Sequence, residues 1–443
     1  MNKETGVAES RESGSVPSRP LNGGDVTAVE GAGKFSASGR VPEAILSWRP
    51  QIGIARIIAR LNVGGPAMQA ILMTEALGAR GYGTVLIAGQ VAPGEAGMDY
   101  LAQAREVNVV ALPTMSRSLS WRADLVSLFQ LTRLLRQHKP LIVHTHTAKA
   151  GALGRLAAMM AGIPLRVHTF HGHVFHGYFP PLLTRAFLGI ERFLARHTDC
   201  VIAISESQKK ELTERYRIAP ADKVAVVPLG LDLDPFLQVN GRDGRRGGMM
   251  PGSVPGVGWV GRFTAIKDPN LFLDCANGLK DSGARFVMVG GGELLPACQQ
   301  RVRQEQMQGA IRFLGWQRDL ATIYADVDMI VCTSINEGTP VALIEAMACA
   351  KAVVSTDVGG VRDLMAGPAK LVDGLELFEN GILVKREARL LERAIRYLLD
   401  RPEQRHTMGQ AGRSFVRKRF SQKRLADDLD RLYISLARAK GLL

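Results

Sequence analysis

Between residue 52 and about residue 230, short apolar runs alternate along the chain with longer stretches in which apolar residues recur at helical spacing. Short apolar runs predict buried strands, and the longer periodic stretches predict helices. Strands separated by helices are typical of a parallel sheet with crossover connections. The clearest elements are predicted strands at 54–59, 84–88 and 141–144 and a predicted helix at 66–80.

The alternation is interrupted between residues 231 and 256 and then begins again. The interruption contains a glycine- and arginine-rich run at 241–248 together with prolines, and it shows no periodicity. We therefore interpret 231–256 as a linker, 49–230 and 257–420 as two α/β domains, and 421–443 as a C-terminal helical segment. The second domain is predicted to contain strands at 256–260, 285–289, 311–313, 329–332 and 352–355, and helices are predicted at 404–419 and 423–439.

Residues 1–48 are rich in Gly, Ser, Glu and Pro and nearly lack aromatic residues. Such a segment buries too little apolar surface to offset the entropy of ordering, so a disordered tail is predicted. The polar start of the chain is not followed by the apolar core of a signal peptide, and no uninterrupted apolar run of about 18 residues occurs. A cytoplasmic location is expected. The five cysteines form no C-x-x-C pair and are expected to be reduced, packed thiols.

The formal net charge of +14 indicates a polyanionic partner, which could be nucleic acid, an anionic membrane or a phosphorylated substrate. No helix-turn-helix, zinc-finger or RNA-recognition signature is present, so nucleic acid is not expected. Two segments, 121–138 and 178–196, are both amphipathic and basic. Such helices can lie on anionic lipid, which would place the protein peripherally on the inner face of the plasma membrane. The alternative is that both are ordinary core-facing helices with arginine on the solvent side.

The segment 334–348 carries two carboxylates, Glu337 and Glu345, eight positions apart. It follows the apolar run 329–332, so Glu337 and Gly338 are predicted to lie at the carboxyl end of a central strand, where ligands bind in open α/β sheets. Thr339 is predicted to cap a helix whose first residue is Pro340. That helix is otherwise apolar, which makes Glu345 a buried carboxylate in need of partners. The alternative is an exposed loop acid and a half-exposed helix residue.

Positive charge is expected beside the two acids. Arg262 follows the predicted strand 256–260, and Lys267 lies five residues later, before Asp268 opens a helix. Both side chains can therefore reach one anion from the same sheet edge, as arginine and lysine do in phosphate sites. The alternative is two solvated surface cations. Glycines at the ends of strands, among them Gly291, allow a nucleotide to approach the backbone closely.

In the first half, Gly64 and Gly65 follow the first predicted strand at a tight loop, where main-chain N–H groups can approach phosphate or sugar. The spacing is not G-x-G-x-x-G, which argues against nicotinamide binding. Six histidines between residues 144 and 176 invite a zinc interpretation, but no Cys or acidic ligand lies among them. Two D-x-D triplets, at 232–234 and 326–328, lie in the linker and before a buried strand. No metal is therefore expected.

Taken in order, the motifs resemble those of the family 4 retaining glycosyltransferases over about residues 52–420. The family signature is two glutamates separated by seven residues, as in Glu337 and Glu345. The resemblance implies the GT-B fold, in which two Rossmann-like, doubly wound parallel-sheet α/β domains face each other across a cleft, and it implies that the last helix crosses back onto the first domain. The other matching motifs are 62–67, 144–151, 168–173, 260–263 with Lys267, 289–292 and 380–384.

The resemblance also implies roles for single residues. Arg262 and Lys267 would hold the donor diphosphate, Glu345 the ribose hydroxyls, and Glu337 the hydroxyls of the donor sugar. Gly338 and Thr339 would present backbone N–H groups to sugar or phosphate. His171 would face the anomeric carbon, where it would orient the substrates or share a proton. One departure is the segment 359–363, Gly-Gly-Val-Arg-Asp, because many relatives have glutamate directly after the glycine pair.

The implied reaction is metal-independent transfer, with retention, from a nucleotide sugar, with UDP as the expected nucleotide and no cofactor. The expected acceptor is a glycan or polyprenyl-linked oligosaccharide in surface polysaccharide synthesis, because the segments 64–67 and 144–147 resemble those of relatives that assemble exopolysaccharide. Two alternatives are a nucleotide-sugar epimerase of the same fold and a non-catalytic protein that binds nucleotide sugars. A requirement for a second sugar separates transfer from epimerisation.

Overall fold

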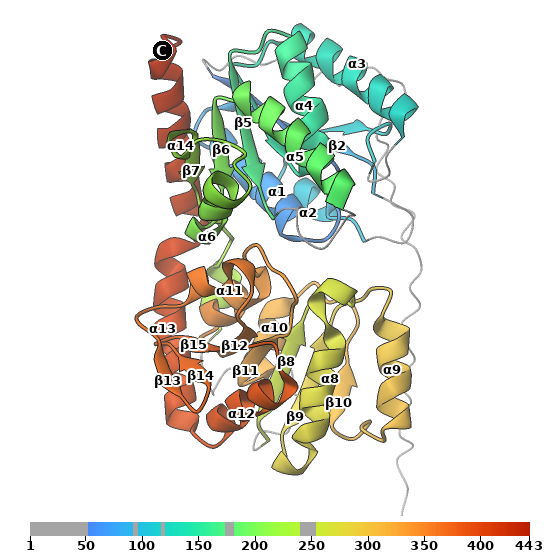
Figure 1. Ribbon diagram of the computed structural model, residues 1–443, viewed down its shortest axis with the longest axis vertical. Helices are drawn as coiled ribbons and strands as arrows, with labels where there is room; N and C mark the ends of the chain where they lie inside the picture. Colours follow the sequence, from blue (N-terminus) through green and yellow to red (C-terminus); the bar gives the residue numbers. More distant parts are fainter. Residues whose placement is uncertain (1–51, 92–95, 117–119, 173–180, 240–253) are drawn as a thin grey trace, which may run out of the picture. The chain divides into compact units, whose positions relative to one another are not determined.

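The computed structural model describes residues 52–91, 96–116, 120–172, 181–239 and 254–443, which fall within one compact unit (Figure 1). The predicted disordered tail, His173, His176, the start of the segment 178–196 and most of the predicted linker lie outside the described residues. Within the described part of the chain, two separate sheets form, one in each half.

The first sheet has seven strands in the order β3-β2-β1-β4-β5-β6-β7, and every neighbouring pair is parallel. Its central strands are buried almost throughout, and β1 and β4 include buried polar residues, among them Arg56 and His144. The strands are β1 (Gly53–Ile58), β2 (Gly83–Gly89), β3 (Val109–Leu112), β4 (Ile142–His146), β5 (Leu165–Phe170), β6 (Cys200–Ala203) and β7 (Val224–Val226).

Helices connect these strands. The small helix α6 begins where Ser205 accepts a hydrogen bond from the backbone N–H of Gln208, which is the usual N-cap arrangement. The helices of this half are α1 (Gly65–Gly78), α2 (Asp99–Ala104), α3 (Trp121–His138), α4 (Ala148–Met160), α5 (Pro181–Arg196), α6 (Glu206–Lys210) and α7 (Asp234–Leu237).

The second sheet has eight strands in the order β10-β9-β8-β11-β12-β15-β14-β13 among the described residues. Its first six strands are parallel, and β13 and β14 add antiparallel pairs at one edge. The strands are β8 (Gly256–Val260), β9 (Arg285–Val289), β10 (Ile311–Phe313), β11 (Met329–Cys332), β12 (Ala352–Thr356), β13 (Lys370–Val372), β14 (Leu375–Leu377) and β15 (Gly381–Val384).

One helix of the second half begins at a predicted signal. Asp268, with a left-handed backbone (φ 46°), caps α8 by accepting from Leu271 N, and Pro269 occupies its first turn. The helices are α8 (Pro269–Gly278), α9 (Leu295–Gln304), α10 (Leu320–Asp326), α11 (Val341–Ala348), α12 (Ala388–Leu399), α13 (Pro402–Arg419) and α14 (Gln422–Ala439). No helix of the described residues has the length and apolar character needed to cross a bilayer.

The last helix packs on the first sheet. Leu425, Leu429 and Tyr433 of α14 share a buried apolar cluster with Ile54 of β1 and Ile142 of β4. The start of α14 is bonded to the first residue of the predicted linker. Leu231 N donates to Phe420 O, and Gln422 N donates to Leu231 O. The crossing of the last helix onto the first domain, which the resemblance implied, is therefore present in the structure (Figure 1).

Candidate functional site

A cavity of about 830 Å³ is lined by residues of both halves of the chain. The first half contributes the loop after β1 and the residue after β5. The second half contributes the loops after β8 and β11 and the start of α11. Nine predicted site residues line it: Gly64, Gly65, His171, Arg262, Lys267, Glu337, Gly338, Thr339 and Glu345. Gly291 does not, although its neighbour Gly290 does.

Gly291 follows β9, at the end of a strand as predicted, but it does not line the cavity. A Cβ atom built on Gly291 would lie 2.3 Å from Nε1 of Trp316, so this glycine provides room for the indole ring. Trp316 itself lines the cavity and is half exposed. The glycine run after β9 therefore brings Trp316 to the cavity wall, in addition to letting the backbone of Gly290 face the cavity.

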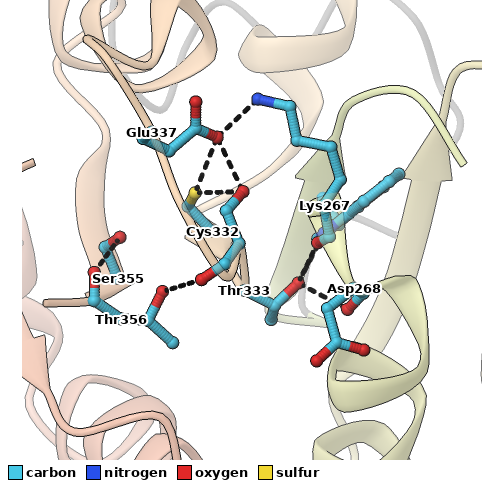
Figure 2. A network of polar contacts seen from close by, with 9 residues as sticks. Lys267, Asp268, Cys332, Thr333, Glu337, Ser355 and Thr356 are labelled. Atoms are coloured by element: carbon cyan, nitrogen blue, oxygen red, sulfur yellow. Dashed lines mark hydrogen bonds and ion pairs between the residues drawn. The ribbon is translucent and has the colours of Figure 1, made fainter. Parts of the chain in front are cut away.

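Glu337 and Lys267, which both line the cavity, form an ion pair (Figure 2). Nζ of Lys267 contacts Oε1 of Glu337, and the same oxygen accepts a hydrogen bond from Oγ of Ser334 at 2.6 Å. The thiol of Cys332 lies 3.9 Å from this oxygen. The sequence predicted that both charged residues reach the same sheet edge, but it did not predict their direct contact or the part of Ser334.

The loop that carries Lys267 is fixed to the end of β11. Oγ1 of Thr333 lies 3.0 Å from the carbonyl oxygen of Lys267 and 2.9 Å from that of Asp268, and it accepts from Nε1 of Trp259 (Figure 2). Ile335 N also donates to the carbonyl of Ile266. Thr333 was missed at the sequence level. The available signal was a pair of hydroxyl residues, Thr333 and Ser334, directly after an apolar strand.

Lys267 remains a cation in this setting. Burial acts to lower the pKa of its ammonium group, and Arg262 acts in the same direction. The charge and hydrogen bond of Glu337 act oppositely and hold the pKa of Lys267 above its ordinary value. The cavity therefore contains a fixed positive charge beside a carboxylate, and this ammonium group cannot serve as a base near neutral pH.

Gly359 and Gly360, in the segment 359–363 that differs from many relatives, contact the Glu337 loop. Gly360 N donates to the carbonyl oxygen of Glu337 at 3.0 Å. A Cβ on Gly359 would lie 1.9 Å from that same oxygen, and a Cβ on Gly360 would lie 1.8 Å from the carbonyl oxygen of Gly338. Gly359 also has a positive φ of 53°. Only glycine fits at these positions, which gives this loop a backbone role.

The prediction that Thr339 caps a helix starting at Pro340 is wrong. Helix α11 begins at Val341, and Pro340 occupies the N-cap position with an extended backbone (φ −72°, ψ 108°) and no side-chain cap. Thr339 thus lies one residue outside the cap. Its Oγ1 has no hydrogen-bond partner within the described chain and lies on a residue that lines the cavity.

Glu345 is a buried carboxylate, as predicted, with an exposed fraction of 4%. Its Oε2 accepts a hydrogen bond from the hydroxyl of Tyr324 at 2.8 Å. Burial raises the pKa of Glu345 to about 7, although the Tyr324 bond acts to lower it. Tyr324, on α10, was not identified in the sequence, because a tyrosine in an apolar helix gives no signal of its own.

Three predicted residues of the first half lie close to the segment that runs from Glu337 to the start of α11. Gly64 and Gly65 stand at the start of α1, and a Cβ on Gly65 would lie 3.2 Å from Cγ2 of Val341. The carbonyl oxygen of His171 lies 2.4 Å from where a Cβ on Gly338 would be. Gly338 is therefore required for this close approach of His171.

The histidine side chains bond to one another and to neighbouring groups. Nε2 of His171 lies 2.8 Å from Nδ1 of His146, and both nitrogens of His144 bond to hydroxyl groups. Within the described residues, no group of three or more His, Cys, Asp or Glu side chains has metal-binding geometry. In the two D-x-D triplets, Asp232 pairs with Arg105 and Asp328 accepts from Gly256 N.

Comparison with known proteins places this fold and site in one class. Residues 63–235 match the family model "Glycosyltransferase Family 4", and residues 254–401 match "Glycosyl transferases group 1". A UDP-Gal:alpha-D-GlcNAc-diphosphoundecaprenol alpha-1,3-galactosyltransferase from Escherichia coli is 31% identical over 270 residues, which cover 59% of this chain and 69% of that protein.

Two solved structures share the fold. The sucrose-phosphate synthase of Thermosynechococcus elongatus has a TM-score of 0.72 at 21% identity, with 88% of this chain and all of that chain covered. Anabaena HepE, in complex with UDP and glucose, has a TM-score of 0.70 at 16% identity, with 86% and 99% covered. The protein is a glycosyltransferase with the GT-B fold. It belongs to glycosyltransferase family 4.

Proposed function

We propose that this protein is a retaining glycosyltransferase that moves a sugar from a UDP-linked donor to a polyprenyl-linked or other glycan acceptor in surface polysaccharide synthesis. The observation that carries the proposal is the paired Lys267 and Glu337 in a cavity that residues of both halves line. The E. coli relative is named for a UDP-Gal donor and a diphosphoundecaprenol acceptor, and HepE was solved with UDP and glucose. Both names agree with the proposed substrates.

In this proposal each charged group has one role. Lys267, with Arg262 on the same cavity wall, faces the donor diphosphate, where negative charge grows as the bond to the anomeric carbon breaks. Glu337 accepts hydrogen bonds from hydroxyls of the donor sugar, and Glu345 accepts them from the ribose. The backbone N–H groups of Gly338 and Thr339 face the sugar or phosphate, beside the start of α11.

Transfer with retention requires that the acceptor oxygen attack from the face that the nucleotide leaves. The bond from the anomeric carbon to the phosphate oxygen breaks, and its electron pair leaves with the diphosphate. The bond to the acceptor oxygen forms on the same face, and the acceptor proton passes to a leaving phosphate oxygen. Lys267 stabilises the developing charge without giving up its own proton, in accord with its raised pKa.

A donor panel with and without acceptor tests this function. The purified chain is incubated with UDP- and other nucleotide-linked sugars, alone and with a polyprenyl diphosphate sugar, and the products are identified by mass spectrometry. We expect UDP release that depends on the acceptor, with an added sugar on the lipid. Conversion of the donor to an isomeric nucleotide sugar without acceptor would indicate an epimerase, and binding without any turnover would indicate a non-catalytic protein.

The pKa of Glu345 makes donor binding depend on pH. In the free protein this carboxyl group is protonated below about pH 7, and the ionised form accepts hydrogen bonds from the ribose hydroxyls more strongly than the neutral form. We expect the dissociation constant of a UDP-sugar, measured by titration calorimetry, to rise about tenfold between pH 8 and pH 6. Glu345→Gln should bind more weakly and lack this dependence, and the same slope in that variant would contradict the assignment.

Folding stability should change with pH in the opposite direction. The pKa of Glu345 is raised from 4.5 in the unfolded chain to about 7 in the folded protein, so the folded state holds an extra proton between these values. This contribution to stability is complete below about pH 4.5 and is lost as the pH rises through 7.

We further propose that α3 and α5 dock on an anionic membrane. Both helices pack against α4, and both carry large apolar side chains that are exposed, such as Trp121 (73%) and Leu182 (79%). Exposed arginines lie beside them, namely Arg122, Arg133 and Arg136 on α3 and Arg185, Arg192 and Arg196 on α5. Apolar side chains flanked by arginines fit the interface of an anionic bilayer, where a polyprenyl acceptor would be found.

Vesicle sedimentation tests this surface. The full chain should pellet with phosphatidylglycerol vesicles and remain in the supernatant with phosphatidylcholine, and high salt should weaken the binding. The double variant Trp121→Ser/Leu182→Ser should lose most of this binding while UDP affinity stays unchanged, because neither residue lines the cavity. Equal binding to both lipids, or unchanged binding of the variant, would contradict the docking surface.

A further inference from the structure

His146 is a buried residue of the site that donor recognition does not explain. It is the last residue of β4 and has an exposed fraction of 0%. Its Nδ1 lies 2.8 Å from Nε2 of His171, which directly follows β5 and lines the cavity. The remaining ring nitrogens, Nε2 of His146 and Nδ1 of His171, are buried and have no hydrogen-bond partner among the described residues. His146 is not among the residues that line the cavity.

Both rings are neutral at physiological pH. Burial lowers the pKa of His171 to about 3, and burial with the charges of neighbouring groups lowers the pKa of His146 well below its ordinary value. A hydrogen bond between two neutral imidazoles contains one proton, which belongs to one ring or the other. The ring that accepts this hydrogen bond carries its own proton on its other nitrogen.

The two arrangements differ in where an unpaired N–H is left. If His171 donates, the proton of His146 lies on Nε2, which is buried on a residue that does not line the cavity. If His146 donates, the free N–H is on Nδ1 of His171, which is also buried but belongs to a residue that lines the cavity. A buried N–H without a partner is the rarer and more costly defect, so the second arrangement is favoured once a ligand is present.

The ring of His144, which packs against His146, has a hydrogen-bond partner at each nitrogen. Nη2 of Arg56 donates to the hydroxyl oxygen of Tyr433 at 3.3 Å, and this oxygen lies 2.6 Å from Nδ1 of His144. Nε2 of His144 lies 2.7 Å from Oγ1 of Thr169. The His144 ring packs against His146 with centroids 4.4 Å apart. Tyr433 of α14 thus helps to hold the rings in place.

We propose that His146 is a positioning residue that donates from Nδ1 to Nε2 of His171 and so fixes His171 as the tautomer with its proton on Nδ1. His171 then acts as a hydrogen-bond donor to an oxygen of the bound donor sugar and not as a general base. The tautomer and the identity of that oxygen rest on the proposed function, whereas the contact between His146 and His171 does not.

The tautomer can be observed directly in the protein saturated with a UDP-sugar that binds it. The full chain is labelled with ¹⁵N-histidine, and long-range ¹H–¹⁵N spectra at pH 7 assign protonated and bare nitrogens, with His171→Asn identifying the His171 signals. We expect Nδ1 of His171 to carry the proton and its Nε2 to be bare. A proton on Nε2 of His171, or an imidazolium at pH 7, would overturn the proposal.

Variants test the consequence for transfer. In His146→Asn the amide nitrogen takes the place of Nδ1 and can still donate, so kcat should stay within about fivefold, whereas His146→Leu should lower kcat by about 10- to 100-fold. The dissociation constant of UDP should change in neither. Equal kcat values for the Asn and Leu variants would overturn the positioning role. An inactive wild-type protein with the expected spectrum would instead count against the proposed function.

Discussion

Replacing Lys267 with methionine should lower kcat for sugar transfer by about 100- to 1,000-fold, the usual effect of removing a group that stabilises developing negative charge. Methionine keeps most of the length of the side chain and removes only the ammonium group. The leaving diphosphate would then lack the cation that lies beside Glu337. Initial rates at saturating donor and acceptor measure the effect.

Two further lysine variants make this result specific. Lys370→Met removes a lysine from an exposed strand of the same sheet, and its kcat should match that of the wild type. Lys267→Arg keeps the charge but spreads it over a planar group, and its kcat should lie between those of the wild type and the methionine variant. If Lys267→Met kept more than about a tenth of the wild-type kcat with an unchanged melting temperature, the role of Lys267 would be refuted.

Replacing Glu337 with glutamine should lower kcat/KM for the nucleotide sugar by about 100-fold while leaving the affinity for UDP within about threefold. The reason is that Glu337 is assigned to the transferred sugar and not to the nucleotide. Loss of its charge also frees Lys267 from its partner, so binding of the diphosphate should not weaken. Calorimetric titration with UDP and initial rates with the intact donor separate the two effects.

Ser334→Ala provides the matched control for Glu337. It removes the 2.6 Å hydrogen bond to Oε1 but leaves the charge and the Lys267 contact, so kcat/KM should fall by only about tenfold. Because Lys267 and Glu337 touch, the double variant Lys267→Met/Glu337→Gln should lose less activity than the product of the single losses. Full multiplicativity, or a loss of UDP affinity equal to the loss of kcat/KM in Glu337→Gln, would argue against these roles.

The two sheets could be predicted because their strands are buried on both faces and their helices are long enough to show a period. Strands β8, β9, β10 and β11 begin and end at the predicted residues. The strands β3, β6 and β7 and the antiparallel edge strands β13 and β14, of three or four residues each, were not predicted. Whether such a segment forms a strand depends on pairing with a neighbouring strand, and the sequence of the segment alone does not show this.

The candidate site was predictable as a set of residues but not as a set of contacts. Position after a strand placed Glu337, Lys267 and His171 at the sheet edges, and all three line the cavity. The bond between Lys267 and Glu337 joins positions 70 apart, and Thr333, Ser334 and Tyr324 act through bonds that only the folded chain creates. The cap prediction for Thr339 was wrong because it used only the local sequence. In the folded chain, Gly359 and Gly360 pack against the backbone of Glu337 and Gly338, and this contact constrains the loop before α11.

A structure of the protein with an intact UDP-sugar tests the central claim most directly. We expect the ribose hydroxyls within hydrogen-bond distance of Glu345, the diphosphate against Lys267 and Arg262, and a sugar hydroxyl against Glu337, all inside the cavity that both halves line. A nucleotide sugar bound elsewhere, with the Lys267 and Glu337 pair untouched, would contradict the assignment of the donor site.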